Sequence, residues 1–367
     1  MSPARKKLHF SRFDKLLFFT PILIFLIGIL SIYSASFKAQ QALDDTLAAR
    51  QFLWMGVGVL TVFLVVRWDY FKLLDFAWPL YFLSLLFLIV VLFMPARLGA
   101  RRWIDLGGFN FQPSELAKLA VILVLSRFFS SHRPEFLPKS LLFVPFIVVA
   151  VPFLLILKEP DLGTGLILIP VFFAMLYLWG FDPRKLSLLV LAGALLSPVL
   201  FMFLKEYQRS RLLVFINPNL DPLGTGYTII QSKIAIGSGG LFGKGFMGGT
   251  QNQLNFLPER HTDFIFGVVG EEGGFIAAIL VVSLFWLIIR RGYQICGQTP
   301  DRFGSQLACG ITTMLGIQTI INLGMTMGLL PVVGVPLPLV SYGGTSVVMT
   351  MFAIGLLINI KMHRSLF

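Results

Sequence analysis

The sequence predicts an all-α polytopic membrane protein, a single integral membrane domain over residues 1–367 with ten transmembrane helices. Two features of the composition indicate a membrane protein. Hydrophobic residues make up 56% of the chain, and charged residues only 13%. Soluble domains carry roughly 25% charged residues, and disordered chains combine low hydrophobicity with high charge, so both classes are excluded. The third observation is a series of apolar runs, each near the roughly 20 residues that a helix needs to cross a bilayer core.

The first of these runs is expected to be a retained helix. Residues 1–15 are basic, and the apolar run after them continues past residue 30 without a small-residue cleavage site, unlike a removable signal peptide. The second run is short and the seventh contains Pro198, but boundaries inferred from hydropathy shift by a few residues. The predicted spans are 16–36, 51–66, 76–95, 113–130, 139–157, 163–180, 185–204, 264–289, 305–330 and 342–361.

Positive charge decides the orientation, because cytoplasmic loops are enriched in Lys and Arg. With both termini on the cytoplasmic side (N-in/C-in), the inner segments hold 17 of the 30 bases and the short outer loops hold six. Most of the net charge of +12 is therefore explained by the orientation of the chain in a lipid membrane. Nucleic acid is not an expected partner, since the bases are scattered and form no basic domain.

Residues 205–262 form a long extracytoplasmic loop between the seventh and eighth spans. Loops longer than about 15 residues without structure of their own are usually functional or disordered, and this one mixes Ile, Leu and Phe with its charges. Residues 226–237 have an amphipathic helical pattern and are expected to lie in the membrane interface. Residues 237–249 are rich in glycine, which lets backbone N–H groups approach an anion, but they do not match a Walker A loop. A plain flexible connector is the alternative.

Ionisable groups gather at the outer mouth of the eighth span. They are Glu259, Arg260, His261 and Asp263. Thr262 is expected to cap the helix, and Asp263 would then stand in the first turn, where the dipole favours a carboxylate. The simpler interpretation is that Asp263 only stabilises the helix end. The alternative is functional, because Gly267, Gly270 and Gly274 fall on one stripe below it, open to a neighbouring helix or a lipid tail. An acid above such a groove could deprotonate a group attached to a lipid.

Charges inside the spans are costly unless they are paired or hydrated. Glu115 and Lys118 stand three residues apart on the fourth span, so they are predicted to pair. Alternatively, Glu115 only completes the start of a helix with Pro113 at its first position. Three further acids are candidates for a polar cavity, although the first of them is a helix cap by default. They are Asp161, Glu271 and Glu272.

The external bases suit a phosphate or pyrophosphate headgroup, because Arg and Lys are the usual partners of phosphate. The candidates are Arg101, Arg102, Arg209, Arg211, Lys233 and Lys244, with Glu259 and His261 beside them. The four histidines do not have the spacing of a metal site. A divalent cation, Mg²⁺ or Mn²⁺, held by carboxylates and phosphates stays open, and the sequence does not specify it. Cys296 and Cys309 are expected to be small apolar fillers.

Several motifs run along nearly the whole chain. They are RWIDLG at 102–107, FQPSELAK at 111–118, PDLGT at 160–164, YQR at 207–209, QSKIAIGSGG at 231–240, LPERHTDF at 257–264 and GVPLPLVSYGG at 334–344. On these motifs the chain resembles the SEDS family (shape, elongation, division and sporulation). Arg260 and the run at 331–336 are more similar to the elongation branch of the family than to its division branch.

The resemblance implies a peptidoglycan glycosyltransferase with ten transmembrane helices in the bacterial cytoplasmic (inner) membrane. It would polymerise lipid II, the undecaprenyl-pyrophosphate disaccharide-pentapeptide, during elongation, beside a class B penicillin-binding protein that crosslinks the strands. The family's essential acid falls on Asp263, and its fourth-span acid and base fall on Glu115 and Lys118. Gly273 stands where the family often has Leu, which widens the stripe of small residues.

These observations support a hypothesis in which Asp263 is the general base for a glycan 4-hydroxyl and the outer bases hold pyrophosphate. A lipid II flippase is the first alternative, which would need an alternating path and a site near the bilayer midplane. A non-catalytic scaffold for the penicillin-binding protein is the second, and it predicts that changes at Asp263 have no effect.

Overall fold

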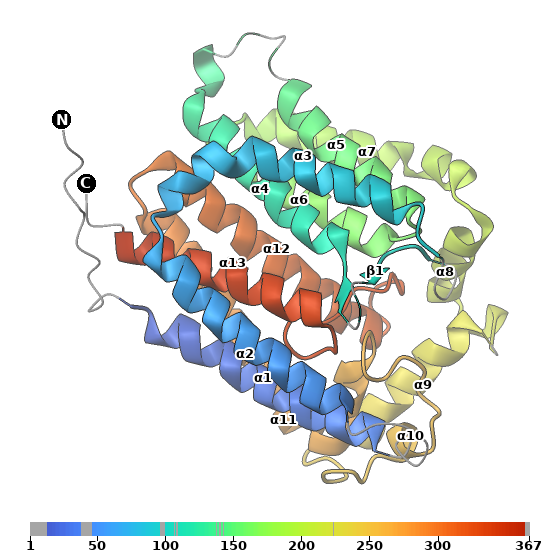
Figure 1. Cartoon of the computed structure of the whole chain (residues 1–367). Helices are drawn as coiled ribbons and strands as arrows, with labels where there is room; N and C mark the ends of the chain where they lie inside the picture. The colour runs from blue at the N-terminus through green and yellow to red at the C-terminus, as the bar shows by residue number, and fades with distance from the viewer. Residues whose placement is uncertain are drawn as a thin grey trace.

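The computed structural model describes residues 13–37, 46–95, 100–105, 107, 109–136, 138, 141, 143–222 and 224–363. They form a bundle of long helices (Figure 1). The first half contains α1 (Lys15–Ser36), α2 (Thr46–Arg67), α3 (Leu73–Val91), α4 (Pro113–Ser131), α5 (Val144–Lys158), α6 (Leu162–Trp179) and α7 (Pro183–Phe203). The second half contains α8 (Glu206–Ile216), α9 (Thr225–Ser238), α10 (Thr250–Gln253), α11 (Ile265–Gln298), α12 (Arg302–Thr326) and α13 (Gly344–His363). Short 3₁₀ turns are η3 (Tyr70–Lys72), η4 (Pro134–Phe136) and η6 (Pro218–Leu220), and β1 (Ile104–Asp105) pairs antiparallel with β2 (Asn110–Phe111).

Each predicted span coincides with one α-helix of the described chain. Within the described residues, seven helices are long and apolar enough to cross a membrane, namely α1, α2, α3, α6, α11, α12 and α13, with the second and third spans taken as Leu47–Arg67 and Tyr70–Val91. α5 is shorter, with 15 residues, and the first residues predicted for its span lie partly outside the described residues. α4 carries three charges, which lowers its hydropathy. The protein is therefore an all-α membrane protein with seven candidate spans, while the count of ten and the orientation stay predictions.

The centre of the bundle is formed by α4, α12 and α13. The most apolar window of α12 is 83% buried, against 28% for α2 and α3. The close approach of α12 to α4 explains part of this burial. Gly310 of α12 has no side chain, and a β-carbon there would stand only 2.6 Å from Ile122 Cγ2 of α4. Figure 1 shows α12 and α13 running through the middle, between α1 and α2 on one side and α3 and α4 on the other.

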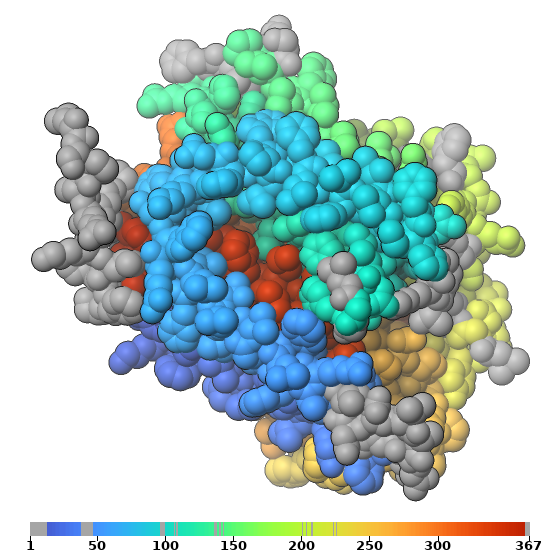
Figure 2. All heavy atoms as spheres, viewed as in Figure 1, coloured from blue at the N-terminus to red at the C-terminus, as the bar shows by residue number. Residues whose placement is uncertain are grey.

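The outer helices present apolar side chains to their surroundings. α1, α2, α3 and α7 all expose large Leu, Ile, Val or Phe side chains, including Phe52 and Leu195, as a lipid-facing surface requires. Figure 2 shows α2 and α3 covering one face, with atoms of α13 visible between them. α7 leaves nearly all of its described side chains exposed, so it is the least packed of the long helices described.

The two ends of the bundle differ. The start of α1 and the end of α13 lie together at one end, whereas α8, α9, α10 and the β-hairpin lie toward the other (Figure 1). At the first end, Asp14 Oδ2 accepts hydrogen bonds from Arg291 Nε and from Lys361 Nζ, each at 2.7 Å. One carboxylate therefore ties α1, α11 and α13 together.

α11 differs from its predicted span, 264–289. It extends to Gln298 and is broken at Gly274, where φ is 66° and ψ is −163°. The glycine-rich segment 237–249 pairs with the backbone groups that the break leaves free. The bonds are Lys244 N to Glu271 O (3.0 Å), Gly245 N to Glu272 O (3.0 Å) and Phe275 N to Gly240 O (2.9 Å). These N–H groups therefore bind α11, and the expectation that they face an anion is wrong for them.

The glycine stripe of α11 is covered by the loop. A β-carbon on Gly270 would stand 3.1 Å from Ile236 Cγ1, and one on Gly267 would stand 3.1 Å from Leu257 Cδ2. The helix predicted at 226–237 is present as α9, and it is the close neighbour that the stripe admits. The alternative expectation of a lipid tail along this stripe is wrong, because α9 and residues near Leu257 occupy the space.

Candidate functional site

Residues 331–343, which connect α12 to α13, form the floor of the candidate site. Asn322 Nδ2 on α12 donates both to Val335 O of this segment (2.7 Å) and to Asp263 O (2.9 Å). Two further bonds join the segment to the residues before α11, namely Ser341 Oγ to Thr262 O (2.7 Å) and Tyr342 N to His261 O (2.9 Å). The backbone of Asp263 is thereby held against this floor.

Asp263 lies just before α11, whose N-cap is Phe264. The expectation that Thr262 caps the helix is wrong, because Thr262 Oγ1 donates to Glu259 O at 3.2 Å and to the Glu259 carboxylate at 3.0 Å. A tight turn at 259–264 therefore precedes the helix and leaves the Asp263 side chain outside it. Among the described residues, no hydrogen bond or ion pair engages the Asp263 carboxylate. It is therefore not a helix cap.

The charges around Asp263 favour a proton acceptor near neutral pH. Burial raises the pKa of Asp263 to about 6, and the negative charges of Glu259 and Asp161 act in the same direction. Arg102 and Arg211 oppose this rise by stabilising the carboxylate. The acid is therefore mostly ionised at neutral pH but more basic than an ordinary aspartate.

Arg102 is the cation beside this acid. Gly334 on the floor has φ of 74°, and a β-carbon there would stand 3.4 Å from Asp263 Oδ2 and 3.7 Å from Arg102 Nη1. The same guanidinium donates through Nη2 to Pro160 O and lies 3.8 Å from Asp161 Oδ1 through Nη1. Its side chain is 17% exposed, so a ligand in the site could reach it.

Asp161 combines the expected capping role with a place in the site. Its Oδ1 accepts from Thr164 N at 3.4 Å, which makes it the N-cap of α6. Its Oδ2 accepts from Gln112 Nε2 at 3.4 Å, just before α4. The starts of α4 and α6 therefore meet at this carboxylate.

One more base expected from the sequence, Arg211, lies at the site, and one acid, Glu159, was missed. Arg211 on α8 donates through Nη1 to Val332 O at 3.3 Å, which brings α8 to the floor. Glu159 is fully buried, and burial raises its pKa to about 9, with the charge of Asp161 acting in the same direction and Arg102 opposing. The only signal for Glu159 in the sequence was its place two residues before Asp161, at the end of an apolar run.

The predicted pair in the fourth span is present. Lys118 Nζ donates to Glu115 Oε1 at 2.8 Å, and the two side chains are 1% and 5% exposed. α4 does begin at Pro113, as expected. Because Gln112 reaches Asp161, the pair lies one to two turns along α4 from the candidate site.

The other predicted bases make different contacts. Arg101 and Arg209 donate to the last carbonyls of α3 and α7, respectively. Lys244 Nζ pairs with Glu271 Oε1 at 2.8 Å. Lys233 is exposed on α9, with its stem over the turn after α12. The structure thus brings Arg102 to Asp263 and holds Arg101, Arg209 and Lys244 elsewhere.

Glu271 and Glu272 join the loop 205–262 to α11. Glu271 is fully buried and accepts from Lys244 Nζ and from two backbone N–H groups of α10, at 2.9 and 3.1 Å. Glu272 accepts from Ser34 Oγ on α1 and from Asn252 Nδ2 (3.0 Å) on α10. Both acids have the polar partners that buried charge needs, and their role here is to anchor α10.

A metal site is not apparent in the described part of the chain, where no three His, Cys, Asp or Glu side chains are grouped to hold an ion. The expectation of Mg²⁺ or Mn²⁺ therefore stays a prediction.

The remaining candidates are a histidine and two cysteines. Burial lowers the pKa of His261. Cys296 and Cys309 are both buried and free, as expected for apolar fillers.

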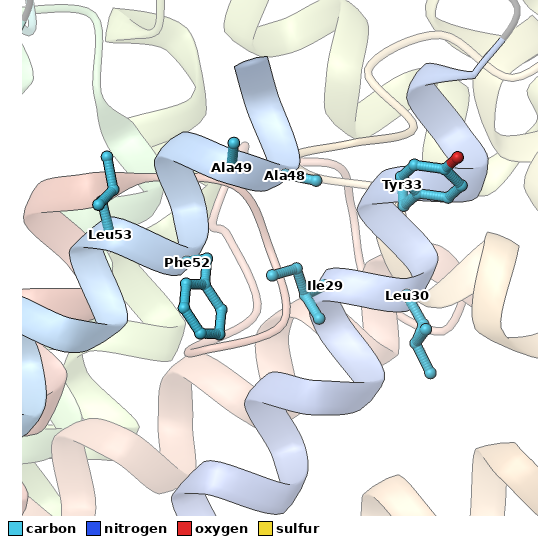
Figure 3. A pocket seen from close by; sticks show the side chains of 7 residues that line it. All are labelled: Ile29, Leu30, Tyr33, Ala48, Ala49, Phe52 and Leu53. Atoms are coloured by element: carbon cyan, nitrogen blue, oxygen red, sulfur yellow. The ribbon is translucent and has the colours of Figure 1, made fainter. Parts of the chain in front are cut away.

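An apolar groove of about 560 Å³ lies apart from Asp263, between α1 and α2 (Figure 3). It is lined by Ile29, Leu30, Tyr33, Ala48, Ala49, Phe52 and Leu53. Figure 3 shows these side chains on two neighbouring helices. The lining carries no charge, so the groove offers no group for acid–base chemistry.

Sequence comparison decides the family. Residues 14–366 match the model of FtsW, RodA and SpoVE, described as cell cycle proteins. The chain belongs to this family. Peptidoglycan glycosyltransferase MrdB of Escherichia coli is 44% identical over 291 residues, 78% of each chain. Stage V sporulation protein E of Bacillus subtilis is 38% identical over 359 residues, 95% of this chain and 97% of its own.

Solved structures of similar chains have the same fold. Rod shape determining protein RodA of Thermus thermophilus is 29% identical and matches with a TM-score of 0.72, over 96% of this chain and 98% of RodA. A chain from a peptidoglycan synthase complex that coordinates polymerization and crosslinking is 35% identical, with a TM-score of 0.82 over the same shares. Like the other members of the FtsW, RodA and SpoVE family, this is a multi-pass protein of the inner membrane.

Proposed function

We propose that this protein is a peptidoglycan glycosyltransferase that polymerises lipid II into glycan strands during cell elongation. The observation that carries the proposal is Asp263, a half-buried acid with a pKa raised to about 6 and Arg102 beside it. The relative in Escherichia coli, 44% identical, is named a peptidoglycan glycosyltransferase, which supports the same activity here.

Asp263 is proposed to act as the general base. The oxygen of the acceptor sugar's 4-hydroxyl forms a bond to the anomeric carbon of the donor sugar. The bond from that carbon to the pyrophosphate oxygen breaks, and the pyrophosphate leaves with the electron pair. The hydroxyl proton passes to the Asp263 carboxylate, which is free of hydrogen bonds from described residues. General base catalysis of this kind contributes about 10²- to 10⁴-fold in rate.

Arg102 is proposed to stabilise the leaving pyrophosphate. A guanidinium can bind two phosphate oxygens at once, and a partly buried site strengthens the attraction. Because Arg102 Nη1 and Asp263 Oδ2 both lie within 4 Å of the same point above Gly334, the departing anion and the proton acceptor would meet there. Arg211 adds a second positive charge to the same site.

The proposed topology has ten spans with both termini in the cytoplasm, and it places Asp263 and the loop 205–262 on the outer face. The clustering of the start of α1 with the end of α13, away from α8–α10, supports this arrangement (Figure 1). We further propose a class B penicillin-binding protein as partner, supported by the similarity to a chain of a peptidoglycan synthase complex.

The test uses purified full-length protein with its penicillin-binding partner and lipid II in detergent. A detergent micelle has no bilayer to cross, so a protein that only moves lipid II between leaflets would make no glycan polymer. Wild-type protein should form glycan polymer, and Asp263→Asn should lower the rate by about 10²-fold or more. Glu206→Gln, at an exposed acid on α8, is the matched control and should leave the rate unchanged. Polymer from Asp263→Asn at the wild-type rate would exclude Asp263 as the base.

A further inference from the structure

Three buried polar atoms near Asp263 have no hydrogen-bond partner among the described residues. They are Arg102 Nε, Glu159 Oε1 and Glu159 Oε2. Native proteins satisfy nearly all buried polar atoms, because an unsatisfied one destabilises the fold. One nitrogen of Arg102 and both oxygens of Glu159 left unsatisfied in one site therefore require an explanation, and the reaction proposed above does not use Glu159.

The orphan groups are complementary and close in the fold. Arg102 Nη2 already donates to Pro160 O, the carbonyl that follows Glu159 in the chain. Its second contact, to Asp161 Oδ1, is 3.8 Å long, which is beyond hydrogen-bond distance. The positive charge of Arg102 acts on Glu159 strongly enough to oppose the effect of burial on it. The guanidinium is thus anchored through Nη2, its Nε donor is left without a partner in the described chain, and the carboxyl group of Glu159, the residue before Pro160, also lacks one.

We propose that Glu159 is a positioning residue for Arg102: its buried carboxyl group accepts the Nε–H of Arg102 when the guanidinium turns its Nη groups toward an anionic ligand beside Asp263. In that arrangement Arg102 would be held at Nε by Glu159 and would present both Nη groups to phosphate oxygens, the bidentate geometry that a guanidinium offers.

The acid is suited to this task because it does not compete with the ligand for the guanidinium. Burial raises the pKa of Glu159 to about 9, so at neutral pH the group is a carboxylic acid whose carbonyl oxygen still accepts a hydrogen bond. A carboxylate in the same place would pair with the guanidinium and oppose phosphate binding. It follows that an amide, which also has a carbonyl acceptor and no charge, should replace the acid with little loss.

This inference rests on the proposed function only for the identity of the anion, the pyrophosphate of a polyprenyl-linked donor. Its test therefore includes binding of farnesyl pyrophosphate, a soluble probe that carries the same headgroup and requires no turnover. Full-length wild-type protein is compared with Glu159→Gln, Glu159→Ala, Arg102→Ala and the double variant Glu159→Ala/Arg102→Ala. Thermal unfolding of each variant checks that it is folded.

Glu159→Ala is expected to weaken farnesyl pyrophosphate binding by about tenfold, the size of one hydrogen bond to a charged group. The KM for lipid II should rise by a similar factor with less change in kcat, and Glu159→Gln should restore both. In the Arg102→Ala background, Glu159→Ala should have no further effect, because the residue acts through Arg102.

Three results would overturn the inference. They are wild-type affinity in Glu159→Ala, loss in Glu159→Gln as severe as in Glu159→Ala, and additive losses in the double variant. If Glu159→Ala proves unfolded, Glu159→Leu, which has a similar volume and no acceptor, takes its place with the same expected loss. Wild-type protein that binds the probe but makes no polymer would contradict the proposed function and leave the binding test of Glu159 intact.

Discussion

Asp263, which is half-buried, and Glu159, which is fully buried, are two acids of one site that differ in charge at neutral pH. Burial raises the pKa of both, to about 6 for Asp263 and about 9 for Glu159. Two arginines, Arg102 and Arg211, oppose the rise in the pKa of Asp263, whereas, among the described residues, only the charge of Arg102 is seen to oppose the rise for Glu159. Environments that separate the pKa values of neighbouring acids assign their roles. Only Asp263 is then available as a base, and Glu159 is left as an uncharged hydrogen-bonding group.

The raised pKa of Asp263 predicts the acidic limb of the activity profile. The base must be ionised, so kcat/KM for lipid II should fall about tenfold per pH unit below about pH 6, rather than near the usual aspartate value of 3.8. The measurement is initial polymerisation rate from pH 4.5 to 8 in detergent. His261 lies nearby with a lowered pKa, so His261→Gln is the control, and its limb should stay near pH 6. A flat profile down to pH 5 would contradict the assignment.

At the scale of residues, the sequence predicted Asp263 and Arg102 because both are charged residues beside apolar runs. Asp263 follows the long loop 205–262, and Arg102 stands in the short loop before the fourth span. The sequence could not separate Arg102 from Arg209 or Lys244, since their partners, Phe201 and Glu271, are set by turns and tertiary contacts. Glu159 was missed for the same reason. Its neighbours in sequence give no sign that it is fully buried.

At the scale of elements, the break in α11 joins the loop 205–262 to the helix bundle. A helix interrupted within a membrane protein needs other partners for its free backbone groups, and residues 240–245 supply them. Glu271 and Glu272 add side-chain bonds to α10 from the turn before the break. The loop and the first turns of α11 therefore form one unit, and that unit carries Asp263 at its end.

Gly274→Ala should destabilise this unit. The residue has φ of 66° and ψ of −163°, a region nearly restricted to glycine, and its β-carbon would stand 2.3 Å from Gly243 N. Such strain costs about 1–3 kcal/mol before the clash is added, so the midpoint of thermal unfolding should fall by several degrees. The matched control is Gly237→Ala on α9, where a β-carbon would meet no atom within 4 Å. It should be neutral or slightly stabilising, and equal midpoints for the two variants would refute the role of the break.

Hydropathy was sufficient to predict where each long helix lies, because roughly 20 apolar residues in sequence have few other uses. It could not predict the break at Gly274, since a glycine inside an apolar run usually continues the helix. It also placed the end of the eighth span at 289, whereas α11 continues to Gln298. Arg290 and Arg291 end the apolar run but not the helix, because Arg291 has a carboxylate partner on another element, Asp14.

At the scale of the whole molecule, polar contacts between distant segments hold the two ends of the bundle. At the end that carries Asp263, Ser341, Asn322 and Gln51 join the floor of the site to its surroundings. At the other end Tyr70 donates to Asp301, and Asp14 pairs with two bases. None of these pairs follows from spacing in the sequence, because each joins residues more than 10 positions apart whose helices must first pack.

Asp14 offers the clearest measure of this end-to-end organisation. Its Oδ1 caps α1 at Leu17 N, and its Oδ2 accepts from Arg291 and Lys361. Asn caps a helix as well as Asp does, so Asp14→Asn removes the charge while a capping group remains. Both bases are partly exposed, at 35% and 23%, and solvent screening reduces the loss below that of a fully buried pair.

We expect Asp14→Asn to cost about 1–3 kcal/mol and to lower the midpoint of thermal unfolding of the purified protein. Asp182→Asn is the matched control, because Asp182 caps α7 through Arg184 N and has no ion pair among the described residues. It should leave the midpoint unchanged. Polymerisation by folded Asp14→Asn protein should stay at the wild-type rate, since Asp14 lies at the opposite end from Asp263. Equal midpoints for the two variants would show that helix capping, and not the charge, is what Asp14 contributes.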